Sequence, residues 1–134
     1  KEIKVAFAIL KQKTNKIALL HCISAYPTKE EDANLAAISA LKEKFNCLIG
    51  QSDHTPDILV PLYAVAAGAQ VIEKHYKIDK DMDCVDAPVS ITEEQMKKMV
   101  NEIKRLENIF GHGELGLRES EKSCKIFRRL SGIK

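Results

Sequence analysis

The sequence lacks three features that would place it in a class at once: a long apolar run, an excess of one charge, and closely spaced cysteines. No stretch approaches the roughly 18 apolar residues that a membrane-spanning helix requires. The first residues form a charged amphipathic segment, without the basic start and long apolar core of a signal peptide. We therefore expect no membrane partner.

Charge is nearly balanced, because 21 lysines and arginines face 19 acidic residues and leave a net charge of +2. Most lysines are interleaved with acids, and the only basic cluster is the pair Arg128 and Arg129. A pair of this size is typical of a surface or an intersubunit contact rather than of a phosphate-binding patch. The sequence therefore predicts no nucleic-acid partner.

Four cysteines, Cys22, Cys47, Cys84 and Cys124, are scattered without a CxxC motif or the spacing of a zinc finger. This distribution favours reduced thiols and a cytoplasmic location. Because Cys22 and Cys47 fall in or beside expected strands, we interpret both as small buried apolar residues.

A regular alternation of helix and strand signals is present, in a length that suits one domain. Thr28 with Glu31 matches the capping box that opens a helix, and so do residues 92–95. Pro56 suits the first turn of a further helix, and Gly68 suits its end. The expected elements are helices at residues 1–14, 28–45, 56–68 and 92–110 and strands at residues 17–22, 47–50 and 69–73.

This alternation predicts an α/β fold with parallel strands. Three strands cannot close a barrel, and three parallel strands alone would leave both sheet edges bare. Either the chain forms a small open sheet, or it is the last part of an eight-stranded TIM barrel, and the pattern leaves both open. Because the sequence begins with Lys1 rather than methionine, a fragment is also expected.

Two histidines, His54 and His75, lie just after the second and third expected strands. Side chains that leave neighbouring parallel strands at the same end converge, and such folds bind ligands there. Imidazoles are good ligands for divalent transition metals and leave positions open for substrate oxygens and water. The pair therefore indicates a metal site. The alternative is that each imidazole only hydrogen-bonds a nearby backbone group.

Further polar side chains follow the same strand ends. Asp86 lies in the loop after the third strand, where a carboxylate near a metal can orient a water or hold a sugar hydroxyl. Ser52 precedes a helix N-terminus, whose amides can hold phosphate or carboxylate oxygens. Ser24 and Tyr26 lie in the loop after the first strand. The alternatives are a solvated acidic loop, plain turn residues and a packing tyrosine.

Two acids stand beside the histidines. By strand alternation Glu73 shares a side with His75, so we interpret it as a partner that orients the imidazole rather than as a ligand. Asp53 directly precedes His54 and is interpreted as a cap of the following helix.

Four motifs, in order and correctly spaced, resemble the N-acetylneuraminate (sialic acid) synthase family, which includes legionaminic and pseudaminic acid synthases. They are residues 20–27 (LHCISAYP), 31–35 (EDANL), 50–55 (GQSDHT) and 67–76 (AGAQVIEKHY). The resemblance implies a (β/α)8 TIM barrel, of which this chain is the C-terminal portion, about three βα units and the preceding helix. It also implies a transferase that condenses phosphoenolpyruvate with an N-acetylated hexosamine, such as N-acetylmannosamine. The products are a nine-carbon 2-keto sugar acid and phosphate.

The resemblance also assigns roles to the strand-end residues. It implies that His54 and His75 are the two protein ligands of a divalent metal, Mn²⁺ or Mg²⁺, which polarises the aldehyde oxygen of the sugar. It implies that Ser52 binds phosphoenolpyruvate.

On the sugar side, the resemblance implies that Ser24 and Tyr26 line the pocket, although some members have asparagine in place of Ser24. It puts Asp86 near the sugar and the attacking water, which adds to carbon 2 before phosphate leaves by C–O cleavage.

The resemblance covers only part of a family member. In the family, lysines that hold phosphoenolpyruvate and an acidic residue near the aldehyde come from earlier strands. We therefore expect residues 1–113 to be a partial barrel domain and residues 114–134 a tail leading toward the family's C-terminal antifreeze-like domain. The full-length form is expected to be a cytoplasmic homodimer, and the 134-residue chain alone is expected to be inactive. Two other functions stay open: a different metal-dependent TIM-barrel aldolase or hydrolase, and a non-catalytic half-barrel interaction module.

Overall fold

The structure is a computed structural model that describes residues 2–127 of the chain. Helices and strands alternate along it as expected. In order, they are α1 (Glu2–Lys11), β1 (Ala18–Cys22), η1 (Glu30–Asp32), α2 (Ala36–Lys44), β2 (Leu48–Asp53), α3 (Leu59–Ala66), β3 (Val71–Lys74), η2 (Ala87–Val89), α4 (Glu93–Phe110) and η3 (Glu119–Phe127), where η denotes a 3-10 helix.

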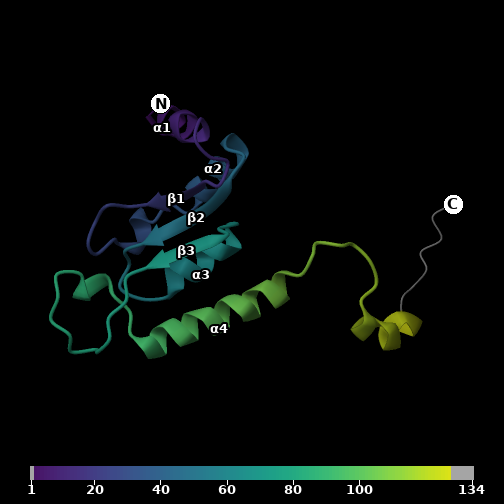
Figure 1. Cartoon of the computed structure of the whole chain (residues 1–134). Coiled ribbons are helices and arrows are strands. Elements are labelled where there is room, and N and C mark those ends of the chain that lie inside the picture. The colour runs from purple at the N-terminus through teal and green to yellow at the C-terminus, as the bar shows by residue number, and fades with distance from the viewer. Residues whose placement is uncertain (1, 128–134) are drawn as a thin grey trace.

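The three strands form one parallel sheet in the order β1-β2-β3. In its register Cys22 lies opposite Ser52. One strand further along, Asp53 lies opposite Lys74. All three strands point the same way, so the loops that follow them gather at one end of the sheet (Figure 1). These features confirm the α/β fold with a parallel sheet, and within residues 2–127 β1 and β3 are its edge strands.

Helices α2 and α3 pack against one face of the sheet, and α4 packs on the outside of α3 (Figure 1). A cluster of buried apolar side chains fills the layer between them. Ile38 and Ile49 are fully buried, and each contributes about 2 kcal/mol by leaving water. Phe7 of α1 meets Phe45 edge-on, with ring centroids 5.0 Å apart, and so attaches the first helix to this core. The cluster consists of Ile38, Phe45, Ile49, Ala64 and Ala69.

The opposite face of the sheet carries exposed apolar side chains, because strand residues alternate between the two faces. Leu48, on this face of β2, is 50% exposed. Gly50 lies two residues further on, where neighbouring chains approach closely. A Cβ atom added there would lie 2.2 Å from the carbonyl oxygen of Val71 and 2.7 Å from Cδ2 of Leu20, so only glycine fits.

The expected helix start at Thr28 is wrong. The Thr28 hydroxyl donates instead to the backbone carbonyls of Ile23, at 3.3 Å, and Ala25, at 3.0 Å. Helix α2 begins only at Ala36. Before it, Asn34 adopts a left-handed conformation with φ 45°, which no continuous right-handed helix accommodates.

The helix start at Pro56 is also wrong. Helix α3 begins at Leu59, whose amide donates to the Asp57 carboxylate at 2.8 Å. Strand β2 continues to Asp53 rather than ending at residue 50, because its last residues pair with β3. Residues 51–53, which were expected to begin a loop, therefore belong to β2 because they pair with β3.

The cysteines are all free thiols within the described part of the chain. Cys22 is exposed and Cys47 only half-buried, so the interpretation of both as buried residues is wrong. Cys22 is exposed because it lies on the sheet face that α2 and α3 do not cover.

Helix α4 begins as expected with a capping box. The Gln95 amide donates to the Thr92 hydroxyl at 3.4 Å, and the Thr92 amide donates to Gln95 Oε1 at 2.9 Å. Beyond α4 the chain runs to η3, which stands apart from the sheet and its helices (Figure 1). Across residues 2–127, no helix combines the length and the apolarity needed to cross a membrane. The pair Arg128 and Arg129 lies outside the described residues.

Candidate active site

The carboxyl ends of the strands bring three aromatic rings together. His54 follows β2 and His75 follows β3, and their ring centroids are 5.2 Å apart. Tyr26, from the loop after β1, stacks on His54 with centroids 4.0 Å apart. It meets His75 edge-on at 5.9 Å. Three loops that are distant in sequence therefore build one cluster.

His54 is held by backbone contacts and is only 5% exposed. Its Nδ1 atom lies 2.9 Å from the carbonyl oxygen of Ile23 and 3.8 Å from Cys22 Sγ. A carbonyl oxygen can only accept a hydrogen bond, so Nδ1 is the donor, and in the neutral ring Nε2 then carries the lone pair. The His54 carbonyl in turn accepts from the Thr28 amide at 2.9 Å. The imidazole is therefore fixed in one tautomer.

His75 has an acidic partner at the same ring position. Its Nδ1 atom lies 3.6 Å from Asp86 Oδ2, and the two side chains are 33% and 46% exposed. The loop that carries Asp86 is closed at its base, because the Ile91 amide donates to the His75 carbonyl at 2.9 Å. The Ser90 hydroxyl donates to the Asp86 carbonyl at 2.7 Å and fixes the end of the loop. Asp86 is thus held close to the His75 ring, although the 3.6 Å separation is longer than a hydrogen bond.

These two imidazoles fit a divalent metal as protein ligands. The contact of His54 Nδ1 with the Ile23 carbonyl leaves Nε2 as the atom that could ligate, and in His75 the Nδ1 atom is the one on the Asp86 side. Among residues 2–127, no group of three or more His, Cys, Asp and Glu side chains is arranged to hold a metal. Any metal held by His54 and His75 would therefore need its other ligands from water, from substrate or from elsewhere in the protein.

Ser52 and Glu73 form a second polar feature, on the face of the sheet away from the core. The Ser52 hydroxyl donates to Glu73 Oε1 at 2.7 Å. Glu73 thus bonds Ser52 rather than His75, so its interpretation as the partner of His75 is wrong. Ser24 is exposed, and its hydroxyl makes no hydrogen bond within the described residues.

Asp53 does not cap the following helix, contrary to the interpretation from sequence. Its carboxylate pairs with Lys74 Nζ at 2.7 Å, and both side chains are about 1% exposed. It also accepts hydrogen bonds from the Thr55 hydroxyl at 2.8 Å and from Gln51 Nε2 at 3.2 Å. Lys74 Nζ also donates to the Thr55 carbonyl.

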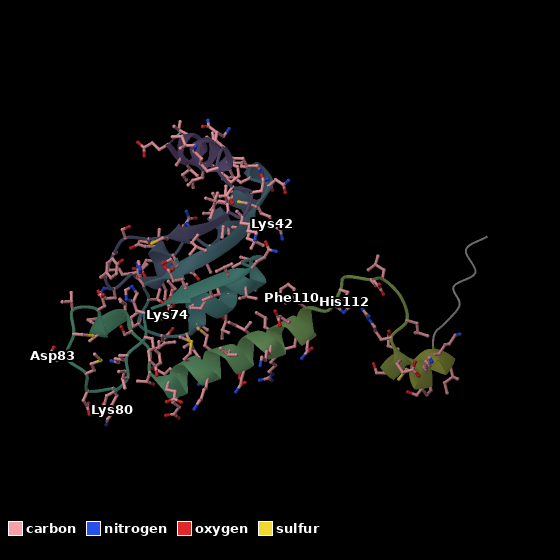
Figure 2. The ribbon with its side chains drawn as sticks, in the orientation of Figure 1. Lys42, Lys74, Lys80, Asp83, Phe110 and His112 are labelled. Carbon is pink, nitrogen blue, oxygen red and sulfur yellow. The ribbon has the colours of Figure 1, made fainter. Side chains whose placement is uncertain are left out.

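The labelled side chains show which polar residues belong to this region (Figure 2). Lys74 is at the strand ends, whereas Lys80 and Asp83 lie on the outer part of the loop between β3 and α4. His112 lies beyond α4 and away from the sheet. No partner for Lys74 was singled out from the sequence. The only sequence signal for its pairing with Asp53 is strand alternation, which puts Lys74 and Asp53 on one face of the sheet and Glu73 and Ser52 on the other.

A model of the NeuB family matches residues 1–115. The chain is 40% identical over 126 residues to a pseudaminic acid synthase of Campylobacter jejuni, covering 94% of this chain and 37% of that protein. It is 41% identical over 115 residues to the N,N'-diacetyllegionaminic acid synthase of Legionella pneumophila, covering 86% of this chain and 32% of that protein. The chain thus spans about a third of these relatives.

A solved structure extends the similarity to three dimensions. It is an N-acetylneuraminic acid (sialic acid) synthetase from Leptospira borgpetersenii in complex with citrate. The TM-score is 0.90 and the sequence identity 43%, covering 99% of this chain and 47% of that one.

Proposed function

The chain belongs to the NeuB family, and we propose that it is the metal-binding part of a nonulosonic acid synthase. The complete protein would condense phosphoenolpyruvate with an N-acetylated hexosamine, such as N-acetylmannosamine, to a nine-carbon 2-keto sugar acid and phosphate. The observation that carries the proposal is the pair of imidazoles whose ring centroids lie 5.2 Å apart at neighbouring strand ends, with His54 Nδ1 on a backbone carbonyl and His75 Nδ1 on the side of the Asp86 carboxylate. Relatives with about 40% identity are named as synthases of this chemical class.

The proposed architecture is the C-terminal portion of a (β/α)8 barrel. Three parallel βα units with helices on one face supply its repeating unit. Edge strands β1 and β3, together with exposed apolar side chains such as Leu48, suit a sheet that continues in the remainder of the protein. In this arrangement residues 1–113 belong to the barrel and residues 114–134 lead toward a further domain.

His54 and His75 would hold a divalent metal, Mn²⁺ or Mg²⁺, through Nε2. Bound there, the metal supplies Lewis acidity toward the aldehyde oxygen of the sugar. The backbone carbonyl of Ile23 and the carboxylate of Asp86 keep the two rings turned toward the site. Tyr26 stacks on His54 and shields that ring from water.

The remaining candidates would contact the two substrates. Ser52, at the end of β2, would hold phosphoenolpyruvate once its hydroxyl turns from Glu73. Tyr26 and Ser24 would form one side of the sugar pocket, and the exposure of both leaves them free to contact a ligand. Asp86 would orient the water that adds to carbon 2, in addition to holding His75.

The test is phosphate release from phosphoenolpyruvate by the complete protein that carries these residues. We expect release only when an N-acetylated hexosamine and Mn²⁺ are both present. His54→Ala and His75→Ala should each abolish it, whereas His112→Ala, beyond the end of α4, should leave it unchanged. Cleavage of a sugar acid or ester without phosphoenolpyruvate would instead indicate an aldolase or hydrolase.

The 134-residue chain by itself is proposed to be inactive, because phosphoenolpyruvate-binding lysines of the kind implied for the family would lie in earlier strands. Formation of keto acid by the purified 134-residue chain would contradict this. Metal binding without any turnover by the complete protein would favour a non-catalytic module.

A further inference from the structure

A buried ion pair lies between the two strand ends that carry the histidines. Lys74 Nζ and Asp53 Oδ2 are 2.7 Å apart, and both side chains are about 1% exposed. Removing an ammonium and a carboxylate from water is costly, and an apolar pair of similar size often gives equal stability. Stability alone therefore does not explain why two charges occupy this place.

The pair fixes the backbone on both sides of His54. Asp53 precedes this histidine, and Thr55 follows it. Lys74 Nζ donates to the Asp53 carboxylate and to the Thr55 carbonyl. The Asp53 carboxylate also accepts from the Thr55 hydroxyl at 2.8 Å and the Thr55 amide at 3.3 Å. One ammonium group and one carboxylate thus define the turn at which the His54 ring is presented.

The same pair fixes His75, because this histidine follows Lys74 directly in the chain. Asp53 and Lys74 are register partners at the ends of β2 and β3, so their contact joins the two strand ends directly beside the histidines. No similarly buried ion pair ties the strands elsewhere in residues 2–127.

We propose that Asp53 and Lys74 are positioning residues that hold the His54 and His75 imidazoles at the separation a shared metal ion requires. The inference rests on the proposed two-histidine metal site and adds the residues that preorganise it. Outer partners of metal ligands generally change metal affinity by about 10- to 100-fold when they are removed. The pair acts through the backbone of both ligands rather than by touching metal or substrate.

The test measures Mn²⁺ affinity of the complete protein by electron paramagnetic resonance, with Mn²⁺ alone as the probe. Lys74→Met alone leaves an unpaired buried carboxylate and risks unfolding. The main variant is therefore Asp53→Asn/Lys74→Met, because it removes both charges and keeps side chains of similar shape. We expect it to unfold near the wild-type temperature and to bind Mn²⁺ at least about tenfold more weakly. Thr55→Val, which loses one bond to Asp53 and keeps both charges, is expected to weaken binding about two- to threefold.

The matched control is Lys97→Met, because Lys97 forms an ion pair with Glu93 at 2.5 Å on the exposed face of α4. Its Mn²⁺ affinity should equal that of the wild type. A second readout needs no metal: imidazole ¹⁵N shifts should report a single Nδ1–H tautomer for His54 in the wild type and a mixture in the double variant.

Wild-type Mn²⁺ affinity and a single His54 tautomer in the double variant would overturn the proposal. So would an equal loss of affinity in Lys97→Met. A wild-type protein that binds no Mn²⁺ would overturn the metal site and this inference with it. This outcome is distinct from failure of the inference alone, because it is seen before any substitution is made.

Discussion

Replacement of Lys74 by methionine tests how strongly the buried ion pair supports the fold. The substitution keeps a long unbranched side chain but removes the positive charge 2.7 Å from the Asp53 carboxylate. Breaking a buried pair from one side typically costs about 3–5 kcal/mol, because the remaining charge is left without compensation.

The structure places this cost at the lower end of that range. Asp53 keeps three hydrogen bonds after Lys74 is removed, from Gln51 Nε2, the Thr55 hydroxyl and the Thr55 amide. We therefore expect the free energy of unfolding to fall by about 3 kcal/mol, which is about two decades in the equilibrium between folded and unfolded protein.

Urea unfolding of the complete protein, followed by circular dichroism and extrapolated linearly to water, measures this loss. Asp53→Asn/Lys74→Met should regain most of the loss, because no charge stays buried. Lys97→Met, at an exposed pair, should stay within about 0.5 kcal/mol of the wild type. A loss below about 0.5 kcal/mol in Lys74→Met would refute the reasoning, since it would mean that the Asp53 carboxylate is hydrated or paired elsewhere.

Three further predictions concern single positions. Gly50→Ala should cost about 3 kcal/mol or more in urea unfolding, because its Cβ would lie 2.2 Å from a backbone carbonyl of β3; wild-type stability would contradict the close approach. Asp86→Ala should weaken Mn²⁺ binding about tenfold through His75 and lower keto-acid formation at saturating Mn²⁺, and unchanged turnover there would remove it from the water-orienting role. The hydrogen bond and charge of Lys97 lower the pKa of Glu93 below its ordinary 4.5. Their contribution to stability is therefore present above pH 4.5 and lost as the pH falls through the folded-state pKa of Glu93. Lys97→Met should raise the pKa of Glu93 in an NMR titration, and an unchanged pKa would contradict this.

Local signals in the sequence were sufficient for much of the fold. The capping box at Thr92 and Gln95 and the helix end at Gly68 were predicted correctly, because such features depend on neighbours a few residues away. The same kind of signal failed at Thr28. There the hydroxyl is used by carbonyls of its own loop, and the amide is bound by the carbonyl of His54, 26 residues later.

The meeting of His54 and His75 at one site followed from the sequence, because alternating helices and strands force the strands to run parallel and bring their ends together. Which ring nitrogen is available did not follow from it. The available nitrogen depends on where the Ile23 carbonyl and the Asp86 carboxylate lie, and the paths of the loops after β1 and β3 determine those positions.

Periodicity and caps are local properties, so the order of the elements, the parallel sheet and the two histidines at its carboxyl end follow from the sequence. The bonds of Ser52 to Glu73 and of Asp53 to Lys74, in contrast, depend on how the strands pair. Both contacts join residues 21 positions apart, and they form only when β2 and β3 adopt one register, which no local pattern specifies.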